Sequence, residues 1–249
     1  MLKEERQKII LNEVLLHNRI LLGDLSDLLN VSIDTVRRDV KELDAMHKLK
    51  KVHGGAVSLG FNVSPYVEQD IYLQKQKVEI ANKAVKFLHN DQVILLSGGT
   101  TILELVNKIP SKLNLTIFTP SLPVAVKLTA FPNIEVIFIG GKLSKEAQIT
   151  VGGNTIKTLS QIKVDLCFLG TGYIDSEFGL SELDWEVVQV KKAMMEASKK
   201  TILLTISQKI NSTQRFKICD ISAIDTLITE LDPSSDFLKP FITQNIHVL

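Results

Sequence analysis

The chain has 249 residues, of which 45% are hydrophobic and 23% are charged, and its formal net charge is +1. The length suits either one large globular domain or a small domain followed by a larger one. No apolar run approaches the roughly 20 residues of a membrane span, which excludes a transmembrane helix. The start of the chain has no signal-peptide pattern, so we expect a cytoplasmic protein without a membrane partner. Because the net charge is close to zero, any DNA-binding surface must be local.

The cysteines and histidines give no sign of a metal centre. Cys167 and Cys219 lie far apart in apolar contexts and form no CxxC motif. We interpret them as buried small hydrophobic residues, in preference to a disulfide or a pair of metal ligands. The five histidines show no ligand spacing, and we expect neither a metal nor a cofactor.

The N-terminal part predicts three short helices. The first covers residues 3–17, where apolar residues recur at four-residue steps. Gly23 then breaks the chain, and a second helix over residues 24–29 is capped by Asp24. A tight turn leads to a third helix that begins after Ser32. Two short helices, a brief turn and a third helix together predict a helix-turn-helix.

The third helix is the candidate DNA-recognition helix. Ser32 is a good N-cap, and Val36, Val40 and Leu43 recur at helical spacing, which marks them as the buried face. A charged face opposite them suits insertion into a DNA major groove. A surface helix with a solvated charged face shows the same pattern, so this stretch alone leaves both interpretations open. The charged residues on and beside this face are Asp34, Arg37, Arg38 and Lys41.

Residues 49–57 predict a β-hairpin after the recognition helix. Strand-forming residues flank Gly54 and Gly55, which break the run. Such a hairpin is the wing of a winged helix, where Lys50, Lys51 and His53 would lie against DNA phosphates and position the protein without reading sequence. The candidate DNA-binding residues are therefore Ser32, Asp34, Thr35, Arg37, Arg38, Lys41, Lys50, Lys51 and His53.

This N-terminal pattern resembles the DeoR family of bacterial transcription regulators. The family pattern runs from an Arg, through apolar residues at four-residue steps, to S-x-x-T-V-R-R-D. It is present here as Arg6, Ile10 and Val14, followed by residues 32–39. The family's wing motif R-V-H-G-G-A is present as residues 51–56, with one replacement. The resemblance implies a DNA-binding regulator whose partner is a double-stranded operator.

Two residues of this part depart from the family pattern. Lys51 stands where the family usually has Arg, which keeps the charge and loses the guanidinium fork. His47 stands where a Gly usually ends the recognition helix, so a left-handed cap at this position would be strained. We expect both residues to tune DNA binding without abolishing it.

A boundary between two domains follows the wing. Residues 58–73 contain Gly, Ser and Pro without a clear period, and we interpret them as a linker. We therefore predict a winged helix-turn-helix DNA-binding domain over residues 1–57 and an effector-sensing and oligomerisation domain over residues 74–249. Helical periodicity resumes over residues 74–89.

The larger domain alternates predicted strands and helices. Its α/β pattern, with nearly continuous apolar strands, predicts a mainly parallel sheet covered by helices. Ligands bind such sheets beyond the carboxyl ends of the strands, so the loops there are the place to look for a site. The predicted strands are residues 93–97, 115–119, 135–139, 165–170, 201–206 and 225–229, and the predicted helices are residues 100–109, 123–130 and about 183–199.

Several of these loops carry glycines, hydroxyls and lysines suited to a sugar phosphate. Residues 97–101, Ser-Gly-Gly-Thr-Thr, follow a strand and open a helix, where backbone N–H groups favour an anion. A Gly-containing turn with a Thr cap fits this stretch equally well. Together the loops suggest one polar rim. The candidate effector-binding residues are Ser97, Gly98, Gly99, Thr100, Thr101, Thr119, Gly140, Gly141, Lys142, Gly170, Asp175, Lys191 and Lys209.

This half also resembles the DeoR family, whose sensor domain is related in fold to ribose-5-phosphate isomerase and the CoA-transferase-like enzymes. The phosphate loop D-x-G-T-T corresponds to residues 97–101, the K-x-A-M helix to residues 191–194 and the closing strand I-D-x-L-I-T-D to residues 224–230. Ser97, Pro120 and Ile206 replace an Asp, an Asn and another Asp of the family. Because these three polar groups are absent, the sequence does not determine which effector binds, or whether the domain binds an effector.

These residues are compatible with three functions. The first is a transcription regulator that represses carbohydrate-metabolism genes. It binds its operator as a homo-oligomer, and a phosphorylated sugar or related metabolite releases it. The second is an isomerase-like enzyme with a DNA-binding head, which needs a carboxylate acid/base that Ser97 and Ile206 no longer supply. The third is a regulator whose large domain only oligomerises. We expect the first, and no enzymatic activity.

Overall fold

The computed structural model describes residues 1–59 and 73–249, and it divides into two compact units, Met1–Tyr72 and Leu73–Leu249. Each unit is described by itself. Most of the predicted linker, residues 60–72, lies outside the described residues. In the described part of the chain, no helix is both long and apolar enough to cross a membrane.

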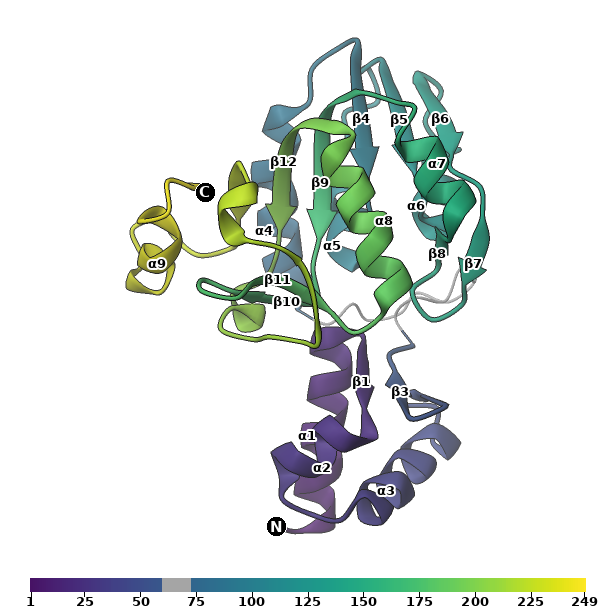
Figure 1. The fold of residues 1–249 in the computed structure, drawn as a ribbon, viewed down its shortest axis with the longest axis vertical. Helices are drawn as coiled ribbons and strands as arrows, with labels where there is room; N and C mark the ends of the chain where they lie inside the picture. Colours follow the sequence, from purple (N-terminus) through teal and green to yellow (C-terminus); the bar gives the residue numbers. More distant parts are fainter. Residues whose placement is uncertain (60–72) are drawn as a thin grey trace. The chain divides into compact units, whose positions relative to one another are not determined.

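The N-terminal unit is a winged helix, as predicted (Figure 1). Its three helices enclose a core in which Ile10, Val14, Leu25, Val36 and Val40 are all buried. The wing strands pair antiparallel in the order β1-β3-β2. In chain order the elements are α1 (Lys3–His17), β1 (Arg19–Leu21), α2 (Leu22–Leu29), α3 (Ile33–Ala45), β2 (Lys50–Val52) and β3 (Gly55–Val57).

The start of α2 differs from the prediction. Gly23 does not break the chain but is the second residue of this helix, and Asp24 lies in its first turn instead of capping it. The reason is tertiary: Leu22 is buried in the core, and its N–H donates to the Gly54 carbonyl at 2.9 Å, which starts the helix earlier. The strand β1 was not predicted, because its three residues are a strand only through their antiparallel pairing with β3.

The C-terminal unit is built on a parallel sheet, in the order β15-β14-β12-β9-β4-β5-β6, as the strand pattern predicted. Figure 1 shows α7 and α8 on one face of this sheet and α4 and α5 on the other. The strands are β4 (Gln92–Leu96), β5 (Leu115–Thr119), β6 (Ile134–Phe138), β9 (Val164–Gly170), β12 (Ser198–Leu204), β14 (Thr226–Ile228) and β15 (His247–Val248). The helices are α4 (Gln74–Ala84), α5 (Thr100–Lys108), α6 (Leu122–Leu128), α7 (Gly153–Leu159), α8 (Trp185–Glu196) and α9 (Lys239–Ile242).

Two small antiparallel sheets were not predicted. They are formed by β7 (Lys142–Ser144) with β8 (Ile149–Val151), and by β10 (Tyr173–Asp175), β11 (Gly179–Glu182) and β13 (Phe216–Cys219). The predicted helix over residues 183–199 ends at Glu196, because the chain from Ser198 pairs with β9 as part of β12. Cys167 is buried and Cys219 partly exposed, and neither forms a disulfide.

Candidate DNA-binding surface and anion site

The recognition helix α3 has the two faces that its sequence predicted. Ser32 is its N-cap, and the Ser32 hydroxyl accepts a hydrogen bond from the Thr35 N–H at 3.2 Å. Val36, Val40 and Leu43 are buried in the core of the unit. The predicted charged residues Asp34, Arg37, Arg38 and Lys41 are all exposed.

Ion pairing divides the charged residues of α3 into two groups. Asp34 and Arg37, one turn apart, form an exposed ion pair with each other. Their opposite charges offset one another at the start of the helix. The positive charge that this face presents to a polyanion therefore comes mainly from Arg38 and Lys41.

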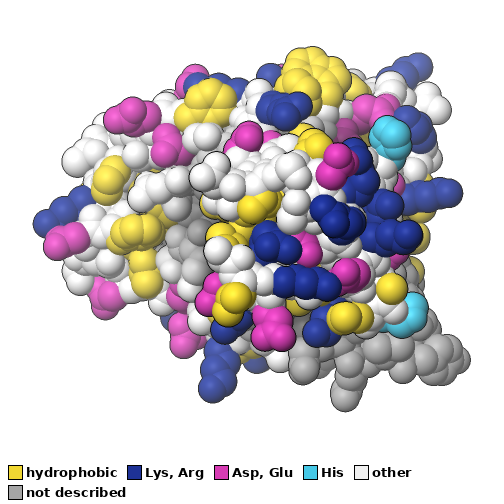
Figure 2. Space-filling model, turned by 90° about the horizontal axis from the view of Figure 1, so that it is seen from below, with side chains coloured by type: hydrophobic (Ala, Val, Ile, Leu, Met, Phe, Trp, Pro, Cys, Tyr) yellow, Lys and Arg dark blue, Asp and Glu magenta, His cyan; other side chains and the backbone are white. Residues whose placement is uncertain are grey.

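The wing presents a second set of cations. Lys50, Lys51 and His53 are exposed, in agreement with a surface role. The Lys51 N–H donates to the Asp44 carboxylate at 3.0 Å, which ties β2 to the last turn of α3. In the view of Figure 2, Lys and Arg side chains lie among acidic and hydrophobic ones. The candidate DNA-binding residues all belong to the N-terminal unit, where they lie on the recognition helix, at its N-cap and on the wing.

One motif residue of α3 has a structural role that sequence reasoning missed. Asp39 is 2% exposed, and its two carboxylate oxygens accept hydrogen bonds from the guanidinium of Arg6 on α1. The hydrogen bond to Asp39 raises the pKa of Arg6 further. The signal was available, since an aspartate among the buried positions of an amphipathic helix needs a partner.

His47 ends the recognition helix in a left-handed conformation, with φ of +54°. The His47 N–H donates to the Asp44 carbonyl at 2.9 Å and the Lys48 N–H to the Leu43 carbonyl at 3.0 Å, the pattern of a Schellman cap. The strained cap expected from the sequence is therefore present.

We predict that His47→Gly stabilises the N-terminal unit. A residue with a Cβ in the left-handed region costs roughly 1–2 kcal/mol, and His47→Gly removes this strain. The larger entropy of Gly in the unfolded chain offsets part of the effect, which leaves a net stabilisation of about 0.5–1 kcal/mol. Slower amide hydrogen exchange in α3 would measure it. His47→Ala keeps the Cβ and should not give this gain, so an equal gain in both variants would contradict the explanation.

In the C-terminal unit, Ser97 connects two of the predicted loops. It is buried at the end of β4, where its hydroxyl accepts from the Gly170 N–H at 2.8 Å and lies 3.3 Å from the Gly98 carbonyl. A Cβ on Gly170 would lie 3.0 Å from the same carbonyl, so the two loops are in close contact. The structure therefore places Ser97 between the loops after β4 and β9, with its hydroxyl already occupied.

The loop after Ser97 leads directly into α5. Gly99 has φ of +114°, a conformation that a glycine adopts without strain, and it is the N-cap of α5. Thr100 and Thr101 are buried in the first helical turn. The backbone N–H groups of this turn have no carbonyl partner within the helix, as at every helix start.

The next loop, after β5, contains a residue that sequence reasoning did not select. The hydroxyl of Thr119 accepts from the Ser121 N–H at 3.1 Å, so it serves its own loop. The hydroxyl of Ser121 is buried and has no hydrogen-bond partner among the described residues. A Cβ on Gly98 would lie 3.3 Å from that hydroxyl, which places Ser121 beside the β4 loop.

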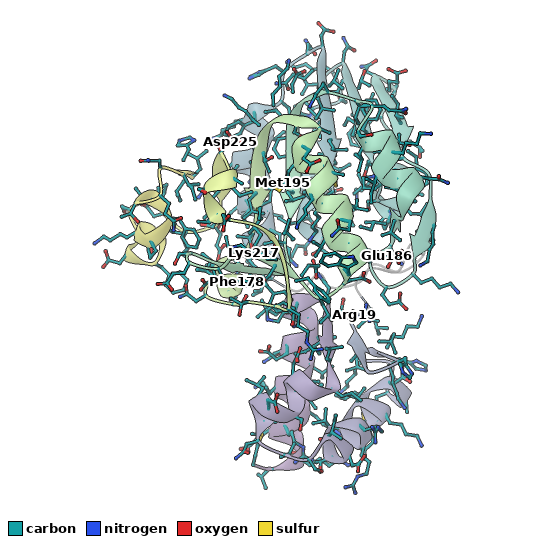
Figure 3. All side chains as sticks on the ribbon, viewed as in Figure 1. Arg19, Phe178, Glu186, Met195, Lys217 and Asp225 are labelled. Carbon is teal, nitrogen blue, oxygen red and sulfur yellow. The ribbon has the colours of Figure 1, made fainter. Side chains whose placement is uncertain are left out.

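Some of the predicted effector residues have partners elsewhere in the protein. Gly140 accepts a hydrogen bond from the Thr155 hydroxyl at 3.1 Å, and a Cβ on Gly141 would lie 2.2 Å from that hydroxyl. Lys142 is exposed and pairs with Glu186 at 2.8 Å, which raises the pKa of Lys142. Figure 3 shows Glu186 at the start of α8. The carboxylate of Asp175 accepts from two N–H groups of the turn between β10 and β11.

The predicted lysines Lys191 and Lys209 come together in the interior. Lys191 pairs with Glu182 at 2.8 Å, and the Lys209 ammonium donates to the Thr171 carbonyl at 2.8 Å. Burial, together with the charges of Lys77 and Lys191, lowers the pKa of Lys209 to about 7. Burial alone would raise the pKa of Glu182, but the two lysines Lys191 and Lys209 and a backbone N–H lower it.

Ile206, which stands at the second of the two positions where the sequence lacks the family's aspartates, has no polar role. Ile206 is buried as a core residue. Beside it, the carboxylate of Glu230 accepts hydrogen bonds from the N–H of Ser207, at 3.0 Å, and from its hydroxyl. The groups of three or more His, Cys, Asp or Glu that could hold a metal ion are absent from residues 1–59 and 73–249.

Comparisons with known proteins identify the family of this chain. The DeoR-like helix-turn-helix domain matches residues 6–60, and the DeoR C terminal sensor domain matches residues 73–231. The winged helix and these two matches define a DNA-binding transcription regulator, which is not an enzyme. The chain belongs to the DeoR family.

Several curated relatives match this chain over most of their own length. An uncharacterized HTH-type transcriptional regulator, YulB, from Bacillus subtilis is 33% identical, over 94% of this chain and 92% of the relative. The transcriptional repressor GlcR from the same organism is 30% identical, over 95% and 92%. The glycerol-3-phosphate regulon repressor of Haemophilus influenzae is 30% identical, over 81% and 79%.

Among solved structures, ribose 5-phosphate isomerase A from Methanocaldococcus jannaschii matches with a TM-score of 0.41 and 16% identity, over 56% of this chain and 55% of that chain.

Proposed function

We propose that the chain is a repressor of carbohydrate-metabolism genes that a phosphorylated sugar, or a related phosphorylated metabolite, releases from its operator. The observation that carries the proposal is the buried pair Lys191 and Lys209, both on the sensor unit of a DNA-binding regulator. Lysines are almost never fully buried without a partner for their charge. Glu182 already supplies one for Lys191, at 2.8 Å, whereas the ammonium of Lys209 donates to the neutral carbonyl of Thr171, so an anion that enters the site would balance the charge of Lys209.

The loop that opens α5 supports a phosphate as that anion. Its N–H groups, the glycine Gly99 and the threonines after it are suited to phosphate oxygens at a helix start. The Ser121 hydroxyl offers a further donor or acceptor beside Gly98. The glycerol-3-phosphate regulon repressor among the relatives takes its name from a small phosphorylated polyol, which agrees with this class of ligand.

Operator binding in this proposal requires a homo-oligomer, a dimer or a tetramer. A single recognition helix covers only one half-site, and regulators of this kind read two half-sites through two copies. An effector that binds one arrangement of the copies better than another then shifts the population away from the DNA-binding one.

A thermal-shift measurement against a panel of sugar phosphates tests the effector. A ligand that binds only the folded state raises the free energy of unfolding, by about 2.7 kcal/mol at a concentration 100 times its Kd. The midpoint temperature of unfolding rises accordingly. The same compound should release the protein from its operator. If no phosphorylated compound stabilises the chain, the C-terminal unit serves assembly alone and the effector proposal fails.

The DNA-binding surface is tested by two variants with different signatures. Arg38→Ala should cost about 1–3 kcal/mol of operator affinity and relax base preference, because an Arg on the exposed face of α3 reads bases. Lys51→Ala should weaken binding to all sequences similarly and flatten the salt dependence, because the wing contacts phosphates. Fluorescence anisotropy with operator and unrelated DNA separates the two. Unchanged operator affinity of Arg38→Ala would show that another face of α3 meets the bases.

A further inference from the structure

Ser121 carries a buried hydroxyl that has no hydrogen-bond partner among the described residues. The residue is 1% exposed, and its Oγ atom neither donates nor accepts there. It stands at the N-cap position of α6, where a serine usually accepts from a helix N–H, but it makes no such bond. A buried hydroxyl without a partner costs free energy that an alanine would not cost. The folding of α6 therefore does not explain why this position carries a hydroxyl.

The backbone fixes the position of Ser121. Its N–H donates to the Thr119 hydroxyl at 3.1 Å, and its carbonyl accepts from the Ala125 N–H at 2.9 Å. Ser121 also pairs with Ile149 in an antiparallel bridge, which joins the loop after β5 to β8. The residue is thus held from both sides, so the missing partner is not the result of a loose loop.

The side chain of Ser121 lies against the loop that opens α5. A Cβ on Gly98 would lie 3.3 Å from the Ser121 Oγ atom, and Gly98 precedes the N-cap Gly99. The first backbone hydrogen bond of α5 joins the Leu103 N–H to the Gly99 carbonyl at 3.0 Å. The N–H groups of residues 100–102 therefore have no carbonyl partner within the helix. An unpartnered hydroxyl and unpartnered N–H groups adjoin the same short loop.

We propose that Ser121 is a phosphate-binding residue of the sensor site, whose hydroxyl donates to the same phosphate group that the N–H groups at the start of α5 bind. The inference rests on the proposed function and adds to it a residue outside the loop of residues 97–101. A hydroxyl that donates to a charged phosphate oxygen forms a short and strong hydrogen bond. The bound phosphate then supplies the partner that Ser121 lacks in the unliganded chain.

One substitution should change stability and binding in opposite directions. Ser121→Ala removes a hydroxyl without a partner, so the midpoint temperature of unfolding of the unliganded chain should stay equal or rise. The same change removes a donor to a charged group, so we expect the affinity for phosphate to fall at least about tenfold. A serine that only supported the fold would lower the midpoint temperature instead.

The experiment combines calorimetric titration with thermal unfolding of the full chain. The probes are inorganic phosphate and any sugar phosphate that stabilises the wild type. Ser111→Ala, at an exposed position of the loop after α5, is the matched control and should equal the wild type in both measurements. Ser97→Ala is the contrast within the site. Its hydroxyl already accepts from the Gly170 N–H, so this variant should have a lower midpoint temperature without ligand.

Hydrogen exchange locates the bound phosphate. Phosphate should slow the exchange of the amides of residues 100–102 in the wild type and in Ser111→Ala. Ser121→Ala should show the same slowing only at about tenfold higher phosphate concentration, because its affinity is lower. If phosphate binds the wild type and leaves these amides unchanged, it binds elsewhere and the inference fails.

The outcomes separate the two proposals. A lower midpoint temperature of unliganded Ser121→Ala shows that the hydroxyl supports the fold, which overturns the inference. Equal affinity of Ser121→Ala and the wild type for the probes that bind also overturns it, and leaves the proposed function in place. A loss confined to the sugar phosphate, with inorganic phosphate bound as in the wild type, overturns the contact with phosphate. Absence of binding by inorganic phosphate and every sugar phosphate overturns the proposed function, and the role of Ser121 with it.

Discussion

Replacing Asp39 with Ala should unfold the N-terminal unit at far lower denaturant than the wild type needs. The substitution leaves the guanidinium of Arg6, whose side chain is 13% exposed, beside a cavity and without its two acceptors. Breaking a buried ion pair by removing one partner costs about 3–5 kcal/mol, and we expect the lower end, about 3 kcal/mol, because Arg6 is only partly buried and Glu42 also stabilises its charge. That is a large share of the total stability of a small domain.

Amide hydrogen exchange on the full chain measures this effect unit by unit. We expect exchange in α1 and α3 to become at least about 100-fold faster, since 1.4 kcal/mol corresponds to a factor of ten. Asp34→Ala on the same helix removes an exposed ion pair and should change exchange little. Protection of α1 that survives Asp39→Ala would show that the apolar core alone holds the two helices together.

The pair Arg6 and Asp39 also shows what the sequence could predict and what it could not. The spacing of Val36, Val40 and Leu43 predicted the buried face of α3 correctly, because the period of a helix is a local property. Asp39 lies next to that face, and its partner stands 33 positions earlier in the chain. The pairing depends on how α1 packs against α3, which no local period contains.

The sensor site likewise has features that the local sequence predicts and features that depend on contacts between distant residues. Apolar runs predicted the parallel strands, and the loops at their carboxyl ends followed from that. Which side chains share a site was less predictable. Lys142 pairs with Glu186 on α8, Asp175 bonds its own turn, and Ser97 connects two loops. Lys77, by contrast, reads in the sequence as one more lysine on an amphipathic helix, and only packing against α5 shows that it is buried.

The two glycines of the wing, adjacent in sequence, should respond very differently to substitution. Gly54 has φ of +74° and open space around its Cβ position, whereas a Cβ on Gly55 would lie 2.3 Å from the Ile20 carbonyl oxygen of β1. Gly55 pairs with both Leu21 and Val52, so the backbone cannot move aside without breaking the wing sheet. We expect Gly55→Ala to cost about 3 kcal/mol or more and to weaken binding to all DNA sequences. Gly54→Ala should cost only about 1–2 kcal/mol, the strain of a left-handed residue. Equal losses in hydrogen-exchange protection of β1 for the two variants would contradict this explanation. The short distance between Gly55 and the Ile20 carbonyl would then not be the cause of the larger effect.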